Sequence, residues 1–291
     1  MTVGYRPFSV TVGGVTIDGQ THGRTPDGLY VDWDTGVKGW FETPQAKVSL
    51  SERATGDGAF PVDPSAVLYS ARTVTIGVMA AGPDSDAVAA HRRRLLALAH
   101  RIVPIVVRDG AEETQAEGYV EVEWGKVRRT RAQTGTLTIV CPDPRRYGSV
   151  PHRAYMVPGT GGGGLEWSDS NAHGLEWPLS FADTGGGRNV VTMWNAGTSV
   201  AYPIITASGS IDWLTITDVA TGGQVSYSEH VGWTPLVLDC LSRTAAVAGV
   251  DMSRALSRRD FPSVPAGGST TLALTGTGTG TVAVEWWDTY I

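Results

Sequence analysis

Apolar and polar residues alternate with a period of two over most of this 291-residue chain, which is typical of half-buried β-strands. The alternation begins in residues 8–12 and continues in residues 15–17 after Gly13 and Gly14, so the sequence predicts an opening β-hairpin. Gly, Pro and Asp clusters of the turn type separate the strands that follow. These strands are predicted at residues 28–34, 46–51, 70–78, 102–108, 118–128 and 134–141.

One segment of the first half departs from this alternation. Its apolar residues, Val88 and Leu95 among them, recur at intervals of three and four, which is the spacing of a helix that buries one face. Asp84 or Ser85 can cap its N-terminus. We therefore expect a single α-helix over residues 84–101, lying on a β-sheet.

The composition of the chain changes after Cys141. Pro142 and Pro144 interrupt helix and strand pairing alike, and a long loop-like stretch that follows contains the glycine-rich block 159–164. We expect a first domain over residues 1–148, a linker-like extended segment over 149–180 and a second domain over 181–291. In the second half the strands are predicted at residues 188–194, 201–209, 213–218, 222–227, 235–239, 245–250, 270–275 and 281–288. Short strands at such regular spacing favour a β-sandwich of jelly-roll type.

The composition excludes several classes of protein. Charged residues make up 18% of the chain, below the roughly 25% of an ordinary soluble protein, while Gly 37 and Trp 10 are both high. The formal net charge of -6 offers no positive field that would attract nucleic acid or anionic lipid. No window approaches the ~18 apolar residues of a membrane span, and the first residues lack the apolar core of a signal peptide. We expect folding in a cytoplasm, without recognition of nucleic-acid sequence or insertion into a membrane.

The residues that usually hold metals or cofactors are not arranged for that purpose. The six histidines are scattered, and the glycine-rich block 159–164 lacks the Lys and Ser/Thr of a phosphate-binding loop. Cys141 and Cys240 are isolated from each other and from any CxxC pair, so we expect two buried free thiols. We predict no metal site and no cofactor.

Two acidic pairs are the only arrangement that resembles catalytic chemistry. Asp32 with Asp34, and Glu121 with Glu123, each place two carboxylates on one side of a predicted strand, and carboxylate pairs hydrolyse glycosides. Alternation on a half-exposed strand produces the same pattern for solubility alone. We expect no catalytic residues and no enzyme activity.

Tryptophans gather in the second half of the chain. Exposed Trp side chains on a sandwich can stack on sugar rings, whereas buried ones belong to the core or to a subunit interface. Trp286 shares a strand face with Val282 and Val284, which favours the core for that residue. Core or interface is the preferred interpretation, and glycan stacking by Trp167 and Trp233 is the alternative.

Several short motifs follow one another in an order that resembles a known family. In the first half they are residues 53–59 leading into 69–77, and the Cys141-Pro-Asp-Pro-Arg-Arg-Tyr147 exit from the first domain. In the second half they include Trp194-Asn-Ala-Gly197 and Trp286-Trp-Asp-Thr-Tyr290. This series is similar to that of the distal tail proteins, or minor tail proteins, of phages with long non-contractile tails.

The resemblance implies a structural role in the virion. Such proteins are expected to be mainly β, with an N-terminal β-sandwich or split-barrel domain carrying one α-helix and a C-terminal galectin-like or jelly-roll sandwich. The first domains form a homo-hexameric ring at the distal end of the tail, assembled in the host cytoplasm. The ring joins the tail tube protein to the hub or tail-associated protein, next to the tape measure protein, and supports receptor-binding proteins at the tail tip or baseplate. The alternative is a carbohydrate-binding sandwich module that attaches to host cell-wall glycan.

Overall fold

The structure is a computed structural model that describes residues 8–20, 24–63, 67–126, 129–158 and 189–291. The chain divides into two compact units, which are described one at a time below. The first comprises Met1–Ser149 together with Tyr290–Ile291, and the second comprises Val150–Thr289. The predicted domain bounds, 1–148, 149–180 and 181–291, stay a prediction.

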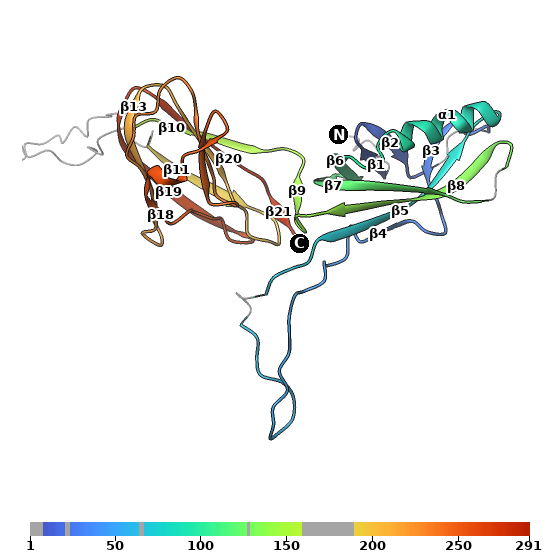
Figure 1. Cartoon of the computed structure of the whole chain (residues 1–291), viewed down its shortest axis with the longest axis horizontal. Helices are drawn as coiled ribbons and strands as arrows, with labels where there is room; N and C mark the ends of the chain where they lie inside the picture. The colour runs from blue at the N-terminus through green and yellow to red at the C-terminus, as the bar shows by residue number, and fades with distance from the viewer. Residues whose placement is uncertain (1–7, 21–23, 64–66, 127–128, 159–188) are drawn as a thin grey trace, which may run out of the picture. The chain divides into compact units, whose positions relative to one another are not determined.

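The first unit is built around a closed barrel of seven strands (Figure 1). Each strand pairs with the next around the circle and the last pairs with the first, so the barrel has no free edge. The order around the barrel is β1 (Ser9–Val12), β2 (Val15–Asp18), β3 (Gly28–Val31), β5 (Arg72–Ala81), β8 (Ala132–Cys141), β7 (Glu112–Trp124) and β6 (Ile102–Asp109). Apolar residues that alternate along these strands, among them Val10, Ile76 and Ile139, are buried inside it.

Three short strands extend the sheet of this unit outside the barrel. β4 (Val37–Lys38) pairs with β5, and β9 (Arg146–Gly148) pairs with β7. β21 (Thr289–Tyr290), at the end of the chain, lies next to β9 in the same sheet. The strand that the sequence predicts over 281–288 is observed as β20 (Thr281–Trp286) in the second unit, whereas Tyr290–Ile291, beyond the predicted end, belong to the first unit.

Helix α1 (Ser85–Leu96) packs on β3, β5 and β8, as the helical spacing predicts, but it is shorter than the predicted range 84–101. Asp84 caps it by accepting hydrogen bonds from the backbone N–H groups of Asp86 and Ala87 at 3.0 and 2.9 Å. The predicted C-terminus is wrong for a physical reason. His100 has a left-handed φ of 61°, and its N–H donates to the carbonyl of Val120 on β7 at 2.8 Å, so sheet pairing replaces the last helical turn.

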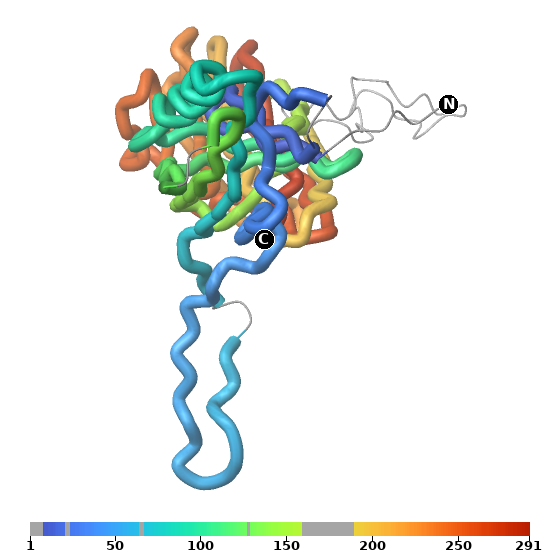
Figure 2. The backbone as a smooth tube through the Cα atoms, turned by 90° about the vertical axis from the view of Figure 1, so that its right-hand side faces the viewer, coloured from blue at the N-terminus to red at the C-terminus, as the bar shows by residue number. Residues whose placement is uncertain are grey.

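The prediction of a strand at residues 46–51 is also wrong, because these residues form no strand. The chain between β4 and β5 is instead a long extension whose two sides meet only at the isolated bridges Ala46↔Tyr69 and Glu52↔Ala59 among the described residues (Figure 2). We call residues 43–71 the arm. Alternation of apolar residues predicts a strand only where a sheet buries one face, and Val48 and Leu50 are both exposed here.

The second unit is a sandwich of two sheets, which confirms the predicted mainly β fold (Figure 1). One sheet has six strands in the order β10 (His152–Met156), β20, β12 (Ile204–Ser208), β15 (Leu236–Asp239), β16 (Thr244–Val247) and β17 (Val250–Asp251). The other has five strands in the order β11 (Val190–Asn195), β19 (Gly268–Gly278), β13 (Ile211–Asp218), β14 (Gln224–Tyr227) and β18 (Leu256–Arg259). The short 3-10 helix η2 (Ser253–Ala255) precedes β18.

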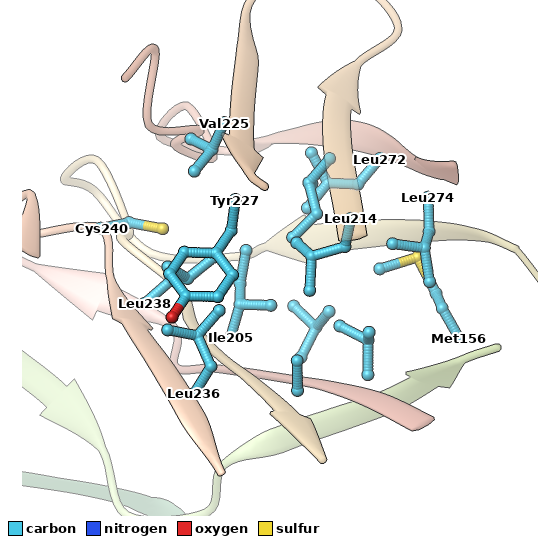
Figure 3. Close-up of a cluster of buried hydrophobic side chains, with 14 of the residues drawn as sticks. Met156, Ile205, Leu214, Val225, Tyr227, Leu236, Leu238, Cys240, Leu272 and Leu274 are labelled. Carbon is cyan, nitrogen blue, oxygen red and sulfur yellow. The ribbon is translucent and has the colours of Figure 1, made fainter. Parts of the chain in front are cut away.

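The core of the sandwich is formed by apolar side chains from both sheets. Figure 3 shows Ile205 and Leu238 of the six-stranded sheet close to Leu214 and Leu274 of the five-stranded sheet. Met156 of β10 is buried in the same core, so residues 152–156 of the predicted linker 149–180 are instead part of the sandwich. The remainder of that predicted linker, from residue 159, lies outside the described residues.

Candidate functional site

The arm gathers several exposed apolar side chains, although the first unit also exposes others outside it, among them Trp33 and Ile102. Leu50 is 63% exposed and Leu68 is 66% exposed, on opposite sides of the extension. A two-stranded ribbon cannot bury such residues by itself, because each needs a second layer to cover it. The other exposed apolar residues of the arm are Val48, Phe60, Val62 and Tyr69.

The base of the arm is held by one buried guanidinium group, that of Arg72 at the start of β5. Its Nη1 donates to the carbonyl oxygens of Gly39, Trp40 and Glu42 at 2.7, 3.0 and 2.7 Å, and its Nε donates to that of Pro144 at 2.8 Å. Burial, followed by the nearby charge of Arg146, lowers the pKa of Arg72. One side chain thus joins the segment that enters the arm to the strand that leaves it.

Close backbone approach and aromatic contacts reinforce this base. Gly39 has φ of 80°, and a Cβ at that position would lie 2.0 Å from the carbonyl oxygen of Thr73, so only glycine fits. The guanidinium carbon of Arg146 lies 5.8 Å from the ring centre of Trp40 and 5.9 Å from that of Tyr290. The indole Nε1 of Trp40 donates to Thr114 Oγ1 at 3.2 Å. The arm therefore begins and ends on a well-fixed support.

The Asp-Pro-x-x-Tyr motif at the exit from β8 has a clear structural role. Asp143 Oδ1 accepts hydrogen bonds from the backbone N–H and the Nη1 of Arg145 at 3.1 and 3.2 Å, and Tyr147 donates its hydroxyl to Oδ2. Burial, together with this hydrogen bond, raises the pKa of Tyr147. The motif fixes the turn from β8 into β9, beside the carbonyl of Pro144 that Arg72 uses.

The two acidic pairs lie in different local structures. Asp32 and Asp34 lie in the turn after β3 and not on a strand, so the expectation that their carboxylates share a strand face is wrong. Glu121 and Glu123 do share the exposed face of β7, as alternation for solubility predicts. Across the described ranges of the chain, no group of His, Cys, Asp and Glu residues could hold a metal ion.

Cys141 and Cys240 are buried free thiols, as predicted. Burial raises the pKa of Cys141 to about 11, and burial likewise raises the pKa of Cys240. Both side chains therefore remain protonated at neutral pH, and a protonated buried thiol is a poor nucleophile.

The tryptophans divide between core and surface. Trp286 is buried, stacks on His152 with ring centres 5.4 Å apart and donates its Nε1 to the carbonyl of Trp194 at 2.8 Å, so its predicted place in the core is confirmed. Trp233 is 93% exposed. Trp167, the other candidate for glycan stacking, lies outside the described residues. Two exposed tryptophans that the strand pattern did not single out, Trp194 and Trp213, lie on the five-stranded sheet.

Comparison with known proteins gives a fold-level match over almost the whole chain. No family model matches this sequence, and no curated protein matches it. The Dit (gp 19.1) protein of phage SPP1, described as a paradigm of the hub adsorption apparatus in phages that infect Gram-positive bacteria, superposes with a TM-score of 0.61 at 15% identity, over 98% of this chain and 100% of that chain. A chain of the phage P2 baseplate in its activated conformation with Ca gives a TM-score of 0.48 at 7% identity, over 96% and 98% of the two chains.

The chain therefore has the two-part β fold of a phage tail-hub protein. The similarity to SPP1 Dit extends through both units, because it covers the complete length of that protein. Among the described residues, no helix has the length and apolar character needed to cross a membrane.

We expect Arg72→Met to lower the free energy of unfolding by about 3 kcal/mol, because four buried or partly buried carbonyl oxygens lose their donor together. Urea unfolding followed by tryptophan fluorescence measures the effect. Arg94→Met, on the exposed face of α1, is the matched control and should change stability by less than about 0.5 kcal/mol. Equal effects of the two substitutions would contradict this role of Arg72.

We expect stability to fall as the pH rises above about 9, partly through Cys141. Its folded pKa of about 11 exceeds the ordinary value of 9.0, so the folded state binds more protons than the unfolded state between these values, and raising the pH favours unfolding. Cys141→Ala should make the loss of stability between pH 9 and pH 11 less steep. Urea titrations at several pH values test this, and an unchanged slope would contradict it.

Proposed function

We propose that this protein is a structural component of the tail tip of a phage with a long non-contractile tail. In this role it forms a homo-hexameric ring that joins the tail tube to the hub and supports receptor-binding proteins. The observation that carries the proposal is the fold-level similarity to SPP1 Dit over 98% of this chain. The motif series of the sequence supports the same class of protein independently of the fold.

The arm supports self-association as the means of ring formation. Its apolar residues are exposed on an extension that its own chain does not cover, whereas the base is fixed by Arg72. A fixed projection that docks on a different surface of the next copy makes a heterologous contact, and repetition of such a contact closes a ring. The closed barrel suits this role, because the edge strands left in the sheet of the first unit are only β4 and β21, of two residues each.

The proposed position of this protein, between the tail tube and the hub, determines its proposed partners. They are other copies of this chain, the tail tube protein, the hub or tail-associated protein, the tape measure protein and the receptor-binding proteins. The proposed location is the distal end of the tail in the virion, after assembly in the host cytoplasm. The proposed role requires no catalysis.

We expect the double substitution Leu50→Asp and Leu68→Asp to prevent ring formation without unfolding the protein, because both side chains are exposed in the single chain. Mass photometry should give six copies for the wild type and one copy for the variant. Val250→Asp, a substitution of a valine that is 62% exposed in the second unit, is the matched control and should leave the hexamer intact. A hexamer formed by the arm variant, or a wild type that is monomeric at every concentration, would count against the proposal.

A second candidate function is attachment to cell-wall glycan, and the exposure of Trp233 favours it. An indole that is 93% exposed offers both faces of its ring to a sugar. We expect the wild type to sediment with purified bacterial cell walls, and Trp233→Ala to reduce the bound fraction several-fold. Trp167→Ala is to be tested in parallel. Absence of binding by the wild type across a panel of walls would end this candidate.

A further inference from the structure

The outer face of the five-stranded sheet in the second unit is dominated by hydroxyl groups. Along β13 and β19 the inward residues, such as Leu214 and Leu274, are buried in the sandwich core. The alternate residues therefore face outward, and they remain partly or fully exposed. The hydroxyl and amide side chains on this face are those of Thr192, Thr215, Thr217, Gln224, Ser226, Thr271, Thr275 and Thr277.

Hydrogen bonds across neighbouring strands fix several of these groups. Thr192 Oγ1 and Thr271 Oγ1 are 2.9 Å apart, and Thr215 Oγ1 donates to Ser226 Oγ at 2.9 Å. A hydroxyl has one donor and two acceptor positions, so each member of such a pair retains hydrogen-bonding capacity toward a ligand. These side chains therefore form a row of ordered donors and acceptors. They would lose little conformational entropy when a ligand binds.

An exposed tryptophan stands at each end of this row. Trp194 on β11 is 56% exposed and pairs with Ser269, and Trp213 on β13 is 39% exposed and pairs with Thr277. The two partners lie on the same strand, β19, and at about 3.3 Å per residue they are roughly 26 Å apart. A linear ligand of several sugar units could contact both indoles.

Trp213 faces outward by simple alternation, because Leu214 and Ile216 after it are buried in the core. The irregularity lies just before it: the register of β13 shifts between Ile211 and Trp213, so that Asp212 is exposed beside Trp213 although the two are neighbours. Such bulges often occur beside functional sites.

The charge of the face selects among ligands. On β11, β19 and β13 the outward residues between the two tryptophans carry no charge; Asp212 lies at the Trp213 end, and Arg258 of the edge strand β18 pairs with Ser226. The six-stranded sheet differs, since its outer face carries the ion pair of Arg153 with Glu285 at 3.0 Å. Apolar faces of sugar rings pack on indoles, and their hydroxyls exchange hydrogen bonds with Thr, Ser and Gln side chains.

We propose that the outer face of the five-stranded sheet binds a linear neutral polysaccharide, with Trp194 and Trp213 as stacking platforms and the intervening hydroxyl groups as polar contacts. The proposal gives the glycan-binding candidate a definite surface, which it places on residues other than Trp167 and Trp233. It does not depend on ring formation.

The test uses the full chain and soluble polysaccharides as probes. Affinity gel electrophoresis with neutral β-glucan, galactan and mannan, and with anionic polygalacturonate, identifies a ligand, and isothermal titration calorimetry then measures its affinity. We expect binding to at least one neutral polymer and none to polygalacturonate. Trp194→Ala and Trp213→Ala should each weaken that binding at least tenfold.

Three further variants make the result specific. Thr275→Glu places a charge on the exposed centre of the face without removing an apolar contact, and it should weaken binding of the neutral polymer to a similar extent. Tyr155→Ala on the outer face of the other sheet is the control for loss of an exposed aromatic ring, and it should bind like the wild type. Thermal melting followed by circular dichroism checks that every variant is folded.

Several results would overturn this proposal. They are failure of the wild type to bind any neutral polymer, binding that is unchanged in the Trp194, Trp213 and Thr275 variants, or binding lost only in Trp233→Ala. A change in copy number by mass photometry in Trp194→Ala, without a change in sugar binding, would make the face a subunit interface instead. The hexamer test with the arm variant is separate, so failure of one proposal leaves the other standing.

Discussion

The guanidinium of Arg72 is the interaction on which the shape of the first unit depends. Residues 39–42, before the arm, and Pro144, after β8, are far apart in sequence, and the carbonyl oxygens of Gly39, Trp40, Glu42 and Pro144 share this donor. A buried arginine is costly unless its hydrogen bonds are made, and here four of them are. The arm can therefore project as a fixed extension although its own two sides are held together by few contacts.

The closed barrel of the first unit supports the arm, and the layered sandwich of the second unit exposes two sheet faces. The seven-stranded barrel is rigid and free of edges, and the Asp143 and Arg146 contacts hold the turn into β9 against it. In the second unit the sandwich core leaves two outer faces of different chemistry, one charged at the Arg153–Glu285 pair and one rich in hydroxyls. The two proposals thus place assembly and ligand binding on different units of the chain, each on its own exposed side chains.

The sequence predicted the parts of the fold that depend on burial of one face. Alternation located β1, β2, β5, β8 and most sandwich strands, since each buries alternate residues in a core. The same alternation failed in the arm, because Val48 and Leu50 have no core within the first unit to face. It also missed β10, whose residues lie in the predicted linker, and it merged β16 with β17. A two-residue turn at Ala248 and Gly249, with φ of 50° and 78°, separates those two strands.

The candidate sites were less predictable than the fold. Nothing in the local sequence marks Arg72 as the group that holds the base of the arm, because its partners come from three distant segments. The exposure of Asp212 beside Trp213 requires a register shift that alternation cannot foresee. The order of motifs did indicate the class of protein, and the similarity to SPP1 Dit agrees with it at the level of the fold. The most direct test of the central claim is electron microscopy of the purified full-length protein at high concentration. The account predicts six-fold rings in which the arm of each copy lies on its neighbour; closed rings whose arms contact no neighbour, or single copies only, would contradict it.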